Sequence, residues 1–191
     1  DQIRYFLLRE VPFGSDGDFS KTALLARING DLSNDLGNLC QRVISMIYKN
    51  CNGFIPSKCE IFNDNDIIFY NKSNALYEKV KNEIDKQSFH EAIKLIWVFI
   101  SDANKYVDEQ APWKLRKTDE RRMNDVLWIL ADTIRKIAII VQPFMPDSST
   151  KILDQLSIDI SERDFSYLDS KHEIKTNKIN SPSPIFPRIE E

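Results

Sequence analysis

The stretch NKYVDEQAPWKLRK, residues 104–117, contains the sharpest interruption of helical pattern in the chain. Proline disfavours helical geometry in the residue before it, so a helix that arrives through Asn104 is expected to end near Ala111, before Pro112. Trp113 follows directly, and three cations come after it: Lys114, Arg116 and Lys117. The stretch therefore predicts a rigid corner between two helices, with an aromatic and basic far side.

Two interpretations of Trp113 follow from residue types. A tryptophan beside a rigid corner and several cations is a surface on which a single-stranded nucleic-acid base could stack. Most aromatic side chains are core residues, however, and in the plainer interpretation Trp113 fills the junction of two helices. Residue types alone favour the plainer interpretation.

A long helix is predicted well before the corner, over residues 21–50, with Ser20 as its N-cap residue. Its apolar residues recur at three- and four-residue steps, which is the period of a buried helical stripe. The stripe consists of Leu25, Ile28, Leu32, Leu36, Leu39, Val43 and Ile47. Gly30 and Gly37 lie in the same helix, where they weaken it and leave room for another backbone to come close.

The region between this helix and the corner is expected to hold a loop and two helices. The loop surrounds Pro56 and leads to a weakly patterned helix over residues 66–84. Ser88 and Glu91 have the spacing of a capping box, so they are expected to open the helix that reaches the corner. The apolar stripe of that helix is Phe89, Ile93, Ile96, Ile100 and Val107.

Beyond the corner, Thr118 is expected to cap a fourth helix, on which Trp128 packs in the core. Its apolar stripe is Met123, Val126, Leu127, Leu130, Ile134, Ile137 and Val141. A short fifth helix is predicted over residues 147–156, and the apolar residues 183–189 are expected to dock back as an extended segment. The predicted fold is all-α, an antiparallel bundle of about five helices with an extended C-terminal tail.

Residues 1–20 stand apart in the predicted organisation. Ile3, Phe6 and Leu7 are typical of the last turns of a helix, and the glycine- and aspartate-containing turn that follows has no core of its own. The chain also begins without methionine. We therefore expect residues 1–20 to be the remnant of a preceding stem-contact or linker region, and residues 21–191 to form one helical domain.

Composition and charge exclude several classes of protein. The net charge of −3 argues against a general basic coat for nucleic acid, so any such binding must be local. The three cysteines lack the C-x-x-C spacing of a zinc site and favour a reduced, cytoplasmic protein, and no apolar run is long enough to span a membrane. Nucleotide-binding loops and nucleophile motifs are absent. The residues predict a binding module without a catalytic or metal site.

Two polar pairs are candidates for the binding surface. Asn38 and Arg42 are four residues apart on the first long helix, and Asn104 and Asp108 have the same spacing just before the corner. Residues four apart share one face of a helix, and a solvated helix edge is the common explanation of such pairs. A nucleic-acid site requires them to converge with Trp113 on one groove, whereas a helical protein-interaction scaffold does not.

The chain resembles the C-terminal part of bacterial methionyl-tRNA synthetases, the class I ligases that join methionine to its tRNA. Four stretches carry the likeness, in order: RYFLLREVPFGSDGDFS at residues 4–20, NDLGNLCQR at residues 34–42, YVDEQAPWKL at residues 106–115 and PSPIFPRIE at residues 182–190. The likeness covers nearly the whole chain. The isoleucyl, valyl, leucyl and cysteinyl synthetases carry related bundles and are the alternative within this class of enzymes.

The resemblance implies a domain that binds tRNA-Met and reads its CAU anticodon. It makes Trp113 the platform on which the first anticodon base stacks, and it gives Asn38 and Arg42 contacts with the anticodon bases. Asn104 and Asp108 match positions linked to the rejection of other anticodons. Stacking on Trp113 and hydrogen bonds to base edges are the physical means of such recognition.

The resemblance also defines what the chain lacks. The family's HIGH and KMSKS-type nucleotide-binding signatures and its zinc knuckle do not occur in the sequence. The implied full-length enzyme aminoacylates tRNA-Met with methionine using ATP and Mg²⁺, and Zn²⁺ is a further candidate cofactor. The chain alone is expected to be catalytically inactive, to bind no cofactor, and to have its own catalytic domain as a partner.

Overall fold

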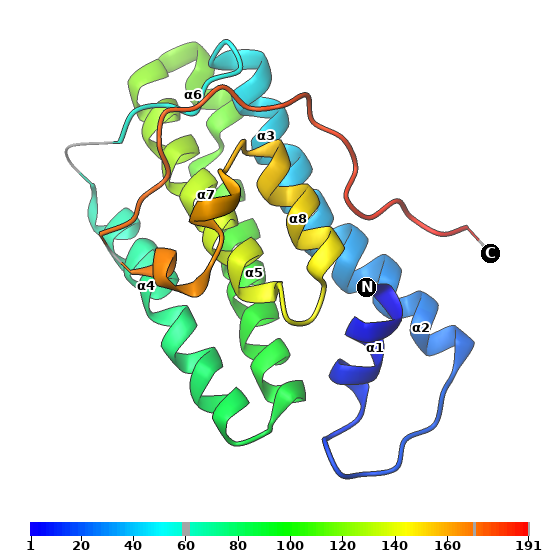
Figure 1. Cartoon of the computed structure of the whole chain (residues 1–191). Coiled ribbons are helices and arrows are strands. Elements are labelled where there is room, and N and C mark those ends of the chain that lie inside the picture. The colour runs from blue at the N-terminus through cyan, green and yellow to red at the C-terminus, as the bar shows by residue number, and fades with distance from the viewer. Residues whose placement is uncertain (59–61, 170, 191) are drawn as a thin grey trace.

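The computed structural model describes residues 1–58, 62–169 and 171–190, and it shows a bundle of helices (Figure 1). The α-helices are α1 (Gln2–Glu10), α2 (Lys21–Arg27), α3 (Asn38–Asn50), α4 (Asp64–Asp85), α5 (Phe89–Gln110), α6 (Pro112–Thr118), α7 (Glu120–Val141) and α8 (Pro146–Gln155). A π-helical segment, η1 (Ile28–Gly37), joins α2 to α3, and the short 3₁₀ turns η2 (Ile160–Glu162) and η3 (Phe165–Leu168) follow α8. These described residues form no β-strand, so the predicted all-α class is confirmed.

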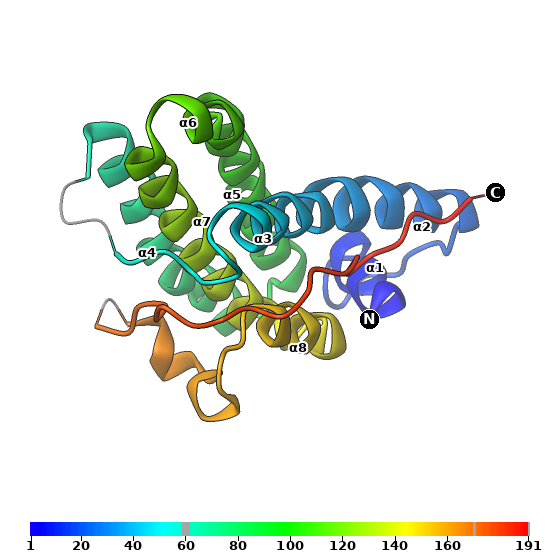
Figure 2. The same cartoon turned by 90° about the horizontal axis from the view of Figure 1, so that it is seen from above.

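Helix α7 lies at the centre of the bundle. Every residue from Val126 to Val141 is buried, because α3, α4, α5, α6 and α8 all pack against this helix (Figure 2). The predicted apolar stripe of α7 is buried in full, and Trp128 is only 1% exposed. Each buried valine, leucine, isoleucine or methionine side chain stabilises the fold by about 1.5–3 kcal/mol. Helix α7 is therefore the main hydrophobic contribution to the core.

The predicted helix over residues 21–50 runs without a break but is not uniform (Figure 1). The side chain of Ser20 accepts a hydrogen bond from the backbone nitrogen of Ala23 at 3.3 Å, which confirms the predicted N-cap. Within η1 the turns are wider, and the backbone N–H of Asn38 reaches the carbonyl of Ser33, five residues earlier. The sequence of η1, INGDLSNDLG, consists largely of weak α-helix formers, which is why a regular α-helix was the wrong expectation here.

The C-terminal tail docks back onto the bundle as predicted, and it meets one of the two glycines. Ile185 and Phe186 are buried, and the tail runs past α8 and α3 (Figure 2). A Cβ atom at Gly37 would stand 3.7 Å from the side chain of Phe186 and 2.9 Å from the carbonyl oxygen of Leu32, so this position has little room for a side chain. Gly30 faces open space, so the close approach predicted for it does not occur.

Of the predicted caps at Ser88 and Thr118, the first occupies the N-cap position without its hydrogen bond and the second is wrong, and a capping box elsewhere was overlooked. Ser88 precedes α5, but its side chain makes no capping hydrogen bond. Thr118 ends α6, and the N-cap of α7 is Asp119, which accepts a hydrogen bond from the backbone nitrogen of Arg122 at 2.9 Å. The capping box of this chain lies at the start of α4, where Asn63 and Asp66 each bind the other's backbone N–H. Residue types permit caps at all these positions, so the sequence alone does not select among them.

Helix α1 is embedded in the bundle on one face only. The ring of Tyr5 is fully buried and lies 4.5 Å, between ring centroids, from that of Trp97 on α5. Phe6 is buried, as its place in the predicted apolar set requires. Ile3 and Leu7, the other members of that set, are 60% and 50% exposed.

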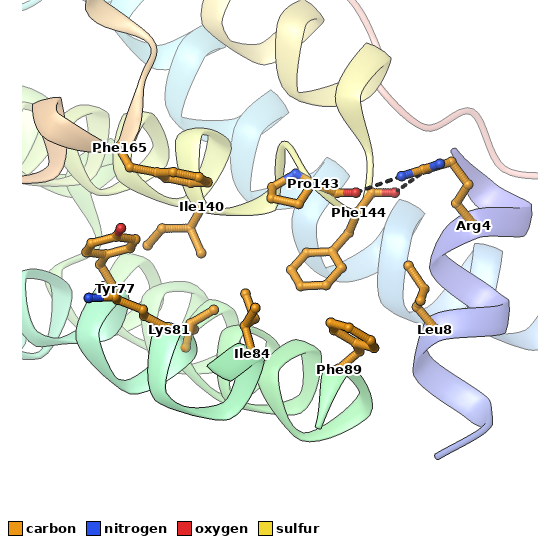
Figure 3. Close-up of a pocket in the computed structure, with 11 residues that line it drawn as sticks. Arg4, Leu8, Tyr77, Lys81, Ile84, Phe89, Ile140, Pro143, Phe144 and Phe165 are labelled. Atoms are coloured by element: carbon orange, nitrogen blue, oxygen red, sulfur yellow. Dashed lines mark hydrogen bonds between the residues drawn. The ribbon is translucent and has the colours of Figure 1, made fainter. Parts of the chain in front are cut away.

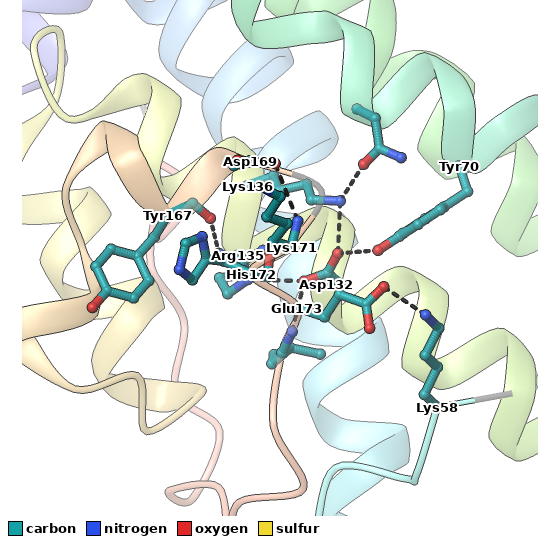
Figure 4. Close-up of polar contacts among 12 residues, drawn as sticks. Lys58, Tyr70, Asp132, Arg135, Lys136, Tyr167, Asp169, Lys171, His172 and Glu173 are labelled. Atoms are coloured by element: carbon teal, nitrogen blue, oxygen red, sulfur yellow. Dashed lines mark hydrogen bonds and ion pairs between the residues drawn. The ribbon is translucent and has the colours of Figure 1, made fainter.

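The buried carboxylate of Asp132, on α7, anchors the segment that follows α8 (Figure 4). It accepts hydrogen bonds from the hydroxyl of Tyr70 at 2.7 Å, Nε of Arg135 at 2.8 Å and the backbone nitrogen of Ile174 at 2.9 Å, and it pairs with Nζ of Lys136 at 2.8 Å. Burial opposes ionisation of this carboxyl, but the charges of Lys136 and Arg135 and the hydrogen bonds outweigh it. The pKa of Asp132 therefore lies below its ordinary value.

Arg135 extends this anchor to η3 and to the chain that follows it. Its Nη1 donates to the carbonyl of Tyr167 at 2.8 Å, and its Nη2 donates to the carbonyl of His172 at 2.7 Å. The guanidinium thus holds a segment with few apolar residues against the bundle. In the sequence, the only signal is a set of charges three and four residues apart, Asp132, Arg135 and Lys136, inside an apolar helix.

We expect Arg135→Met to release this C-terminal segment. The substitution keeps the apolar stem but removes the donors to Tyr167 and His172 and one partner of the buried carboxylate, which should lower the free energy of unfolding by about 3 kcal/mol. Urea unfolding measures the loss, and limited proteolysis of residues 157–177 reports the release. Arg121→Met, at an exposed arginine of the same helix, is the control. Unchanged proteolysis in Arg135→Met would show that other contacts hold the segment.

Candidate nucleic-acid interface

The corner between α5 and α6 has the geometry that the sequence predicts. Helix α5 ends at Gln110, and Ala111 adopts a left-handed conformation with φ 43° and ψ 59°. Pro112 then occupies the first position of α6, where its missing N–H leaves no intrahelical bond unmade. The predicted break near Ala111 is therefore confirmed, but the short helix over residues 112–118 was not predicted.

Trp113 lies on this short helix with its ring partly in solvent. Its exposure is 42%, whereas Trp97 and Trp128 are 8% and 1% exposed. The other two tryptophans therefore act as core residues, whereas part of Trp113 remains at the surface. A partly exposed indole on a rigid helix offers a flat apolar platform at little cost in conformational entropy.

Arg42 joins Trp113 to Asp108, and the three residues come from three different helices. The guanidinium carbon of Arg42, on α3, lies 5.3 Å from the centroid of the Trp113 ring, which is within the range of a cation–π contact. Nη2 of Arg42 also donates to Oδ1 of Asp108, on α5, at 2.6 Å. The structure thus brings three of the five predicted site residues into one cluster, which we call the Trp113 cluster: Arg42, Asp108 and Trp113.

The two asparagines of the predicted site occupy different positions. Asn38 is exposed on α3, one turn before Arg42. Asn104 is half-buried on α5, and its Nδ2 donates to the carbonyls of Asp35 and Ile100, at 3.2 Å each. Its Oδ1 is buried without a hydrogen-bond partner among the described residues. Asn104 therefore faces η1, and its side chain is engaged there and within α5.

A groove beside Asn38 extends the exposed face of α3 toward the C-terminal tail. It has a volume of about 490 Å³. One wall carries the polar side chains of Asn34, Asn38 and Gln41, and the other is formed by residues 184–186 of the tail. Sequence reasoning missed Asn34 and Gln41 as members of this surface. The signal available was the spacing of Asn34, Asn38 and Arg42, which are four residues apart in turn.

The far side of the corner is basic. Lys114, Arg116 and Lys117 are all exposed, and none of them forms an ion pair within the part of the chain that the structure describes. Free cations next to an aromatic platform are the usual composition of a surface that binds single-stranded nucleic acid. This local charge contrasts with the net charge of −3 for the whole chain.

Comparison with known families identifies the domain. Residues 56–191 match a family model described as the anticodon binding domain of methionyl tRNA ligase. The chain belongs to this family. Residues 1–44 match a second model, described as tRNA synthetases class I (M). The family inferred from the four sequence stretches is therefore confirmed, and the related synthetases and the scaffold interpretation are not favoured.

Individual relatives agree with this assignment to the anticodon-binding family. The methionine–tRNA ligase of Brucella suis biovar 1 is 42% identical over 191 residues, which is 100% of this chain and 37% of that protein. The methionine–tRNA ligase of Mycobacterium tuberculosis H37Rv is 42% identical over 194 residues, again 100% of this chain and 37% of that protein. The chain thus spans little more than a third of the length of these relatives.

Solved structures show the same fold. The apo form of Mycobacterium tuberculosis methionyl-tRNA synthetase superposes with a TM-score of 0.94 at 40% identity, over 100% of this chain and 39% of that chain. The same enzyme bound by methionyl-adenylate superposes with a TM-score of 0.92 at 40% identity, over 97% of this chain and 37% of that chain.

The described residues of this anticodon-binding domain offer no metal site and no membrane span. In the described ranges, no group of three or more histidine, cysteine, aspartate or glutamate side chains is placed to hold a metal ion. No helix among the same residues has the length and apolarity needed to cross a membrane. Cys40 and Cys51 are free thiols, and Cys59 lies outside the described residues.

A buried ion pair beneath the corner positions the α5 and α7 ends of the anticodon-binding domain. Arg122, at the start of α7, donates from both terminal nitrogens to the carboxylate of Asp66, at 2.6 Å and 2.7 Å. The hydroxyl of Tyr106, near the end of α5, donates to the same carboxylate at 2.5 Å, and Arg122 also donates to Oε1 of Gln110 at 2.6 Å. Burial opposes ionisation of Asp66, but the hydrogen bonds from Arg122 and Tyr106 outweigh it, so the pKa of this carboxyl is lowered.

We expect Asp66→Asn to destabilise the domain by about 3 kcal/mol at pH 7, because the Arg122 guanidinium would lose its anionic partner in a largely buried site. The lowered pKa of Asp66 means that its ionised form stabilises the fold above the ordinary carboxyl value near 4. That contribution disappears as the pH falls through the lower native pKa. The difference between wild type and variant should therefore narrow in acid.

Urea unfolding at pH 7 and at pH 3 measures this effect. Asp64→Asn is the matched control, because Asp64 is an exposed aspartate in the first turn of the same helix. Its substitution should cost less than about 1 kcal/mol. A stability difference for Asp66→Asn that stays constant down to pH 3 would show that the charge of Asp66 does not carry the effect.

Proposed function

We propose that this domain binds the anticodon loop of tRNA-Met and reads its CAU anticodon at the Trp113 cluster. The observation that carries the proposal is the convergence of a partly exposed indole, a guanidinium and a carboxylate at one end of the bundle, next to unpaired cations. Bases that are splayed out from an RNA loop can stack on such a ring and can be hydrogen-bonded at their edges. In this proposal the first anticodon base stacks on Trp113.

Arg42 and Asn38 are proposed to contact the anticodon bases. The ion pair with Asp108 engages one terminal nitrogen of Arg42, and the remaining donors of the guanidinium fork are free for a base edge. Asn38 is exposed one turn away on the same helix, and its amide can both donate and accept. Together they provide edge recognition next to the surface that provides stacking.

Asp108 and Asn104 are proposed to act against incorrect anticodons by different means. The Asp108 side chain is 63% exposed, so its negative charge faces any base beside Trp113 and disfavours one that presents acceptors. Asn104 is a positioning residue in this proposal. Its hydrogen bond to the carbonyl of Asp35 fixes η1 against α5, and this sets the separation between Asn38 and the corner.

The cations of α6 are proposed to bind the phosphates of the anticodon loop. Lys114, Arg116 and Lys117 are exposed and lie beside Trp113 on the same short helix. Phosphate contacts position an RNA without reading its sequence, and they weaken as salt is added. With phosphates bound by the cations of α6 and bases bound by the Trp113 cluster, a chain of net charge −3 can bind RNA at one place.

The longer protein is proposed to be a methionine–tRNA ligase that joins methionine to tRNA-Met with ATP and Mg²⁺. The curated relatives are methionine–tRNA ligases, and residues 1–44 match the class I synthetase model. Residues 1–20 are proposed to connect the bundle, residues 21–191, to its own catalytic domain. The exposed apolar side chains of Ile3, Leu7, Phe13 and Phe19 would then be the contact surface. The chain alone is proposed to be inactive in aminoacylation.

Binding to an anticodon stem-loop tests the proposed function. The chain should prefer a stem-loop with CAU over the same stem-loop with a changed first base, as measured by fluorescence anisotropy at low salt. Equal affinity for both would reject anticodon reading by this domain. The longer ligase serves as a second protein in the same assay, so a requirement for its catalytic domain is distinguished from absence of the function.

We expect Trp113→Ala to weaken binding of the CAU stem-loop roughly fivefold to a hundredfold, which corresponds to the loss of one stacked base at about 1–3 kcal/mol. Because the ring is partly exposed, the thermal midpoint should change little. Trp113→Phe is the conservative control and should retain part of the affinity. A fall of many degrees in the thermal midpoint would instead make Trp113 a structural residue.

We expect Arg42→Gln to lower affinity for the CAU stem-loop and to reduce the preference for CAU, with little change in stability. Arg116→Gln is the matched control, since a phosphate contact should weaken every stem-loop equally and reduce the salt dependence of binding. Titrations of both variants with the two stem-loops, at two salt concentrations, separate these outcomes. An equal loss for all anticodons in Arg42→Gln would assign Arg42 to the phosphates.

A further inference from the structure

An apolar cavity lies at the side of the bundle where α1 meets α4 and the end of α7 (Figure 3). Its volume is about 400 Å³, and its lining includes the apolar side chains of Val80, Ile84, Ile140 and Phe144. Pockets that bind small molecules are typically about 300–1,000 Å³. An apolar cavity of about 150 Å³ holds benzene, so this cavity has room for a body of two fused rings or a medium-length alkyl chain.

The walls of this cavity are fixed by contacts that need no ligand. Nε of Arg4 donates to the carbonyl of Phe144 at 3.2 Å, and Nη2 of Arg4 donates to the carbonyl of Pro143 at 2.7 Å (Figure 3). These bonds hold α1 over the turn that follows α7. On the opposite side, the rings of Tyr77 and Phe165 are stacked with their centroids 5.5 Å apart. The cavity is therefore preformed, which lowers the entropic cost of filling it.

The charges at the rim have a single sign. Among the lining residues only Arg4 and Lys81 are charged, and both are cations. Arg4 is engaged with two carbonyls, whereas Lys81 is exposed and has no ion-pair partner within the described ranges. An apolar cavity with an unpaired lysine among its lining residues is complementary to a molecule with an apolar body and one negative charge.

We propose that this cavity is a binding site for a small amphipathic carboxylate, an aryl or alkyl acid whose apolar body fills the cavity and whose carboxylate meets Lys81. The site lies apart from the Trp113 cluster and does not depend on the anticodon proposal. Arg4 and Leu8 come from the stretch that matches the class I synthetase model, and the remaining walls come from the stretch that matches the anticodon-domain model. A bound acid therefore bridges the two stretches and holds α1 against the bundle.

The probe for this site is 2-naphthoate, whose two fused rings and single carboxylate match the volume and charge of the cavity. In ¹H–¹⁵N NMR titrations of the 191-residue chain, saturable shifts are expected at α1, at residues 77–89 and at residues 140–144. The neutral analogue 2-naphthalenemethanol should bind about tenfold more weakly, and 2-naphthoate should raise the thermal midpoint of the chain.

Substitutions separate the charge contribution from the apolar contribution. Lys81→Gln should weaken 2-naphthoate about tenfold and leave the neutral alcohol unchanged, so the preference for the acid disappears. Lys79→Gln, at an exposed lysine of the same helix that does not line the cavity, should bind like wild type. Ile84→Trp should fill the cavity and abolish binding of both compounds.

Three results would overturn the proposal. Absence of saturable shifts up to the solubility limit of 2-naphthoate would mean that the cavity does not bind this class of molecule. Equal affinity for the acid and the alcohol, unchanged in Lys81→Gln, would mean that Lys81 contributes no charge recognition. Binding to this chain but not to the longer ligase would mean that the preceding part of the protein occupies the cavity.

Discussion

The carboxylate of Asp66 joins three helix ends, and the geometry of the corner between α5 and α6 depends on this junction. Asp66 lies at the start of α4, Arg122 at the start of α7 and Tyr106 near the end of α5. A buried carboxylate that lost these donors would cost several kcal/mol, so the three ends have one favourable arrangement. Helix α6 spans the gap between the ends of α5 and α7, and the position of Trp113 follows from this constraint.

Helix α7 carries a second buried ion-pair network, and the two networks stabilise different parts of the fold. Arg122 orders the corner, whereas Asp132 and Arg135 hold the segment after α8, which has few apolar side chains of its own. Hydrogen bonds to charged groups have strict geometry, so these networks fix the register of elements that hydrophobic contact alone would leave free to slide. The tail beyond that segment is then held by Ile185 and Phe186, which are buried against the helices.

The surface ion pair between Arg42 and Asp108 has a different role from the buried networks. An exposed pair of this kind contributes at most about 1 kcal/mol to stability, because water and salt screen it. Its effect is to orient the guanidinium beside the indole of Trp113. A preformed arrangement of this sort loses little entropy on binding, which suits the proposed binding of RNA at one place on a domain of net negative charge.

The sequence by itself determined the features encoded by neighbouring residues: the all-α class, the break before Pro112, the stripe of α7 and the docking of the C-terminal tail. It also gave the family, because the four stretches occur in order. Only the tertiary structure decided which distant groups meet. Arg42 and Asp108 are 66 residues apart, and their contact depends on how α3 and α5 are packed. Asn104 is a second example. Its spacing from Asp108 places both on one helical face, but the Asn104 amide binds the carbonyl of Asp35 in η1, where the π-helical turns are wide.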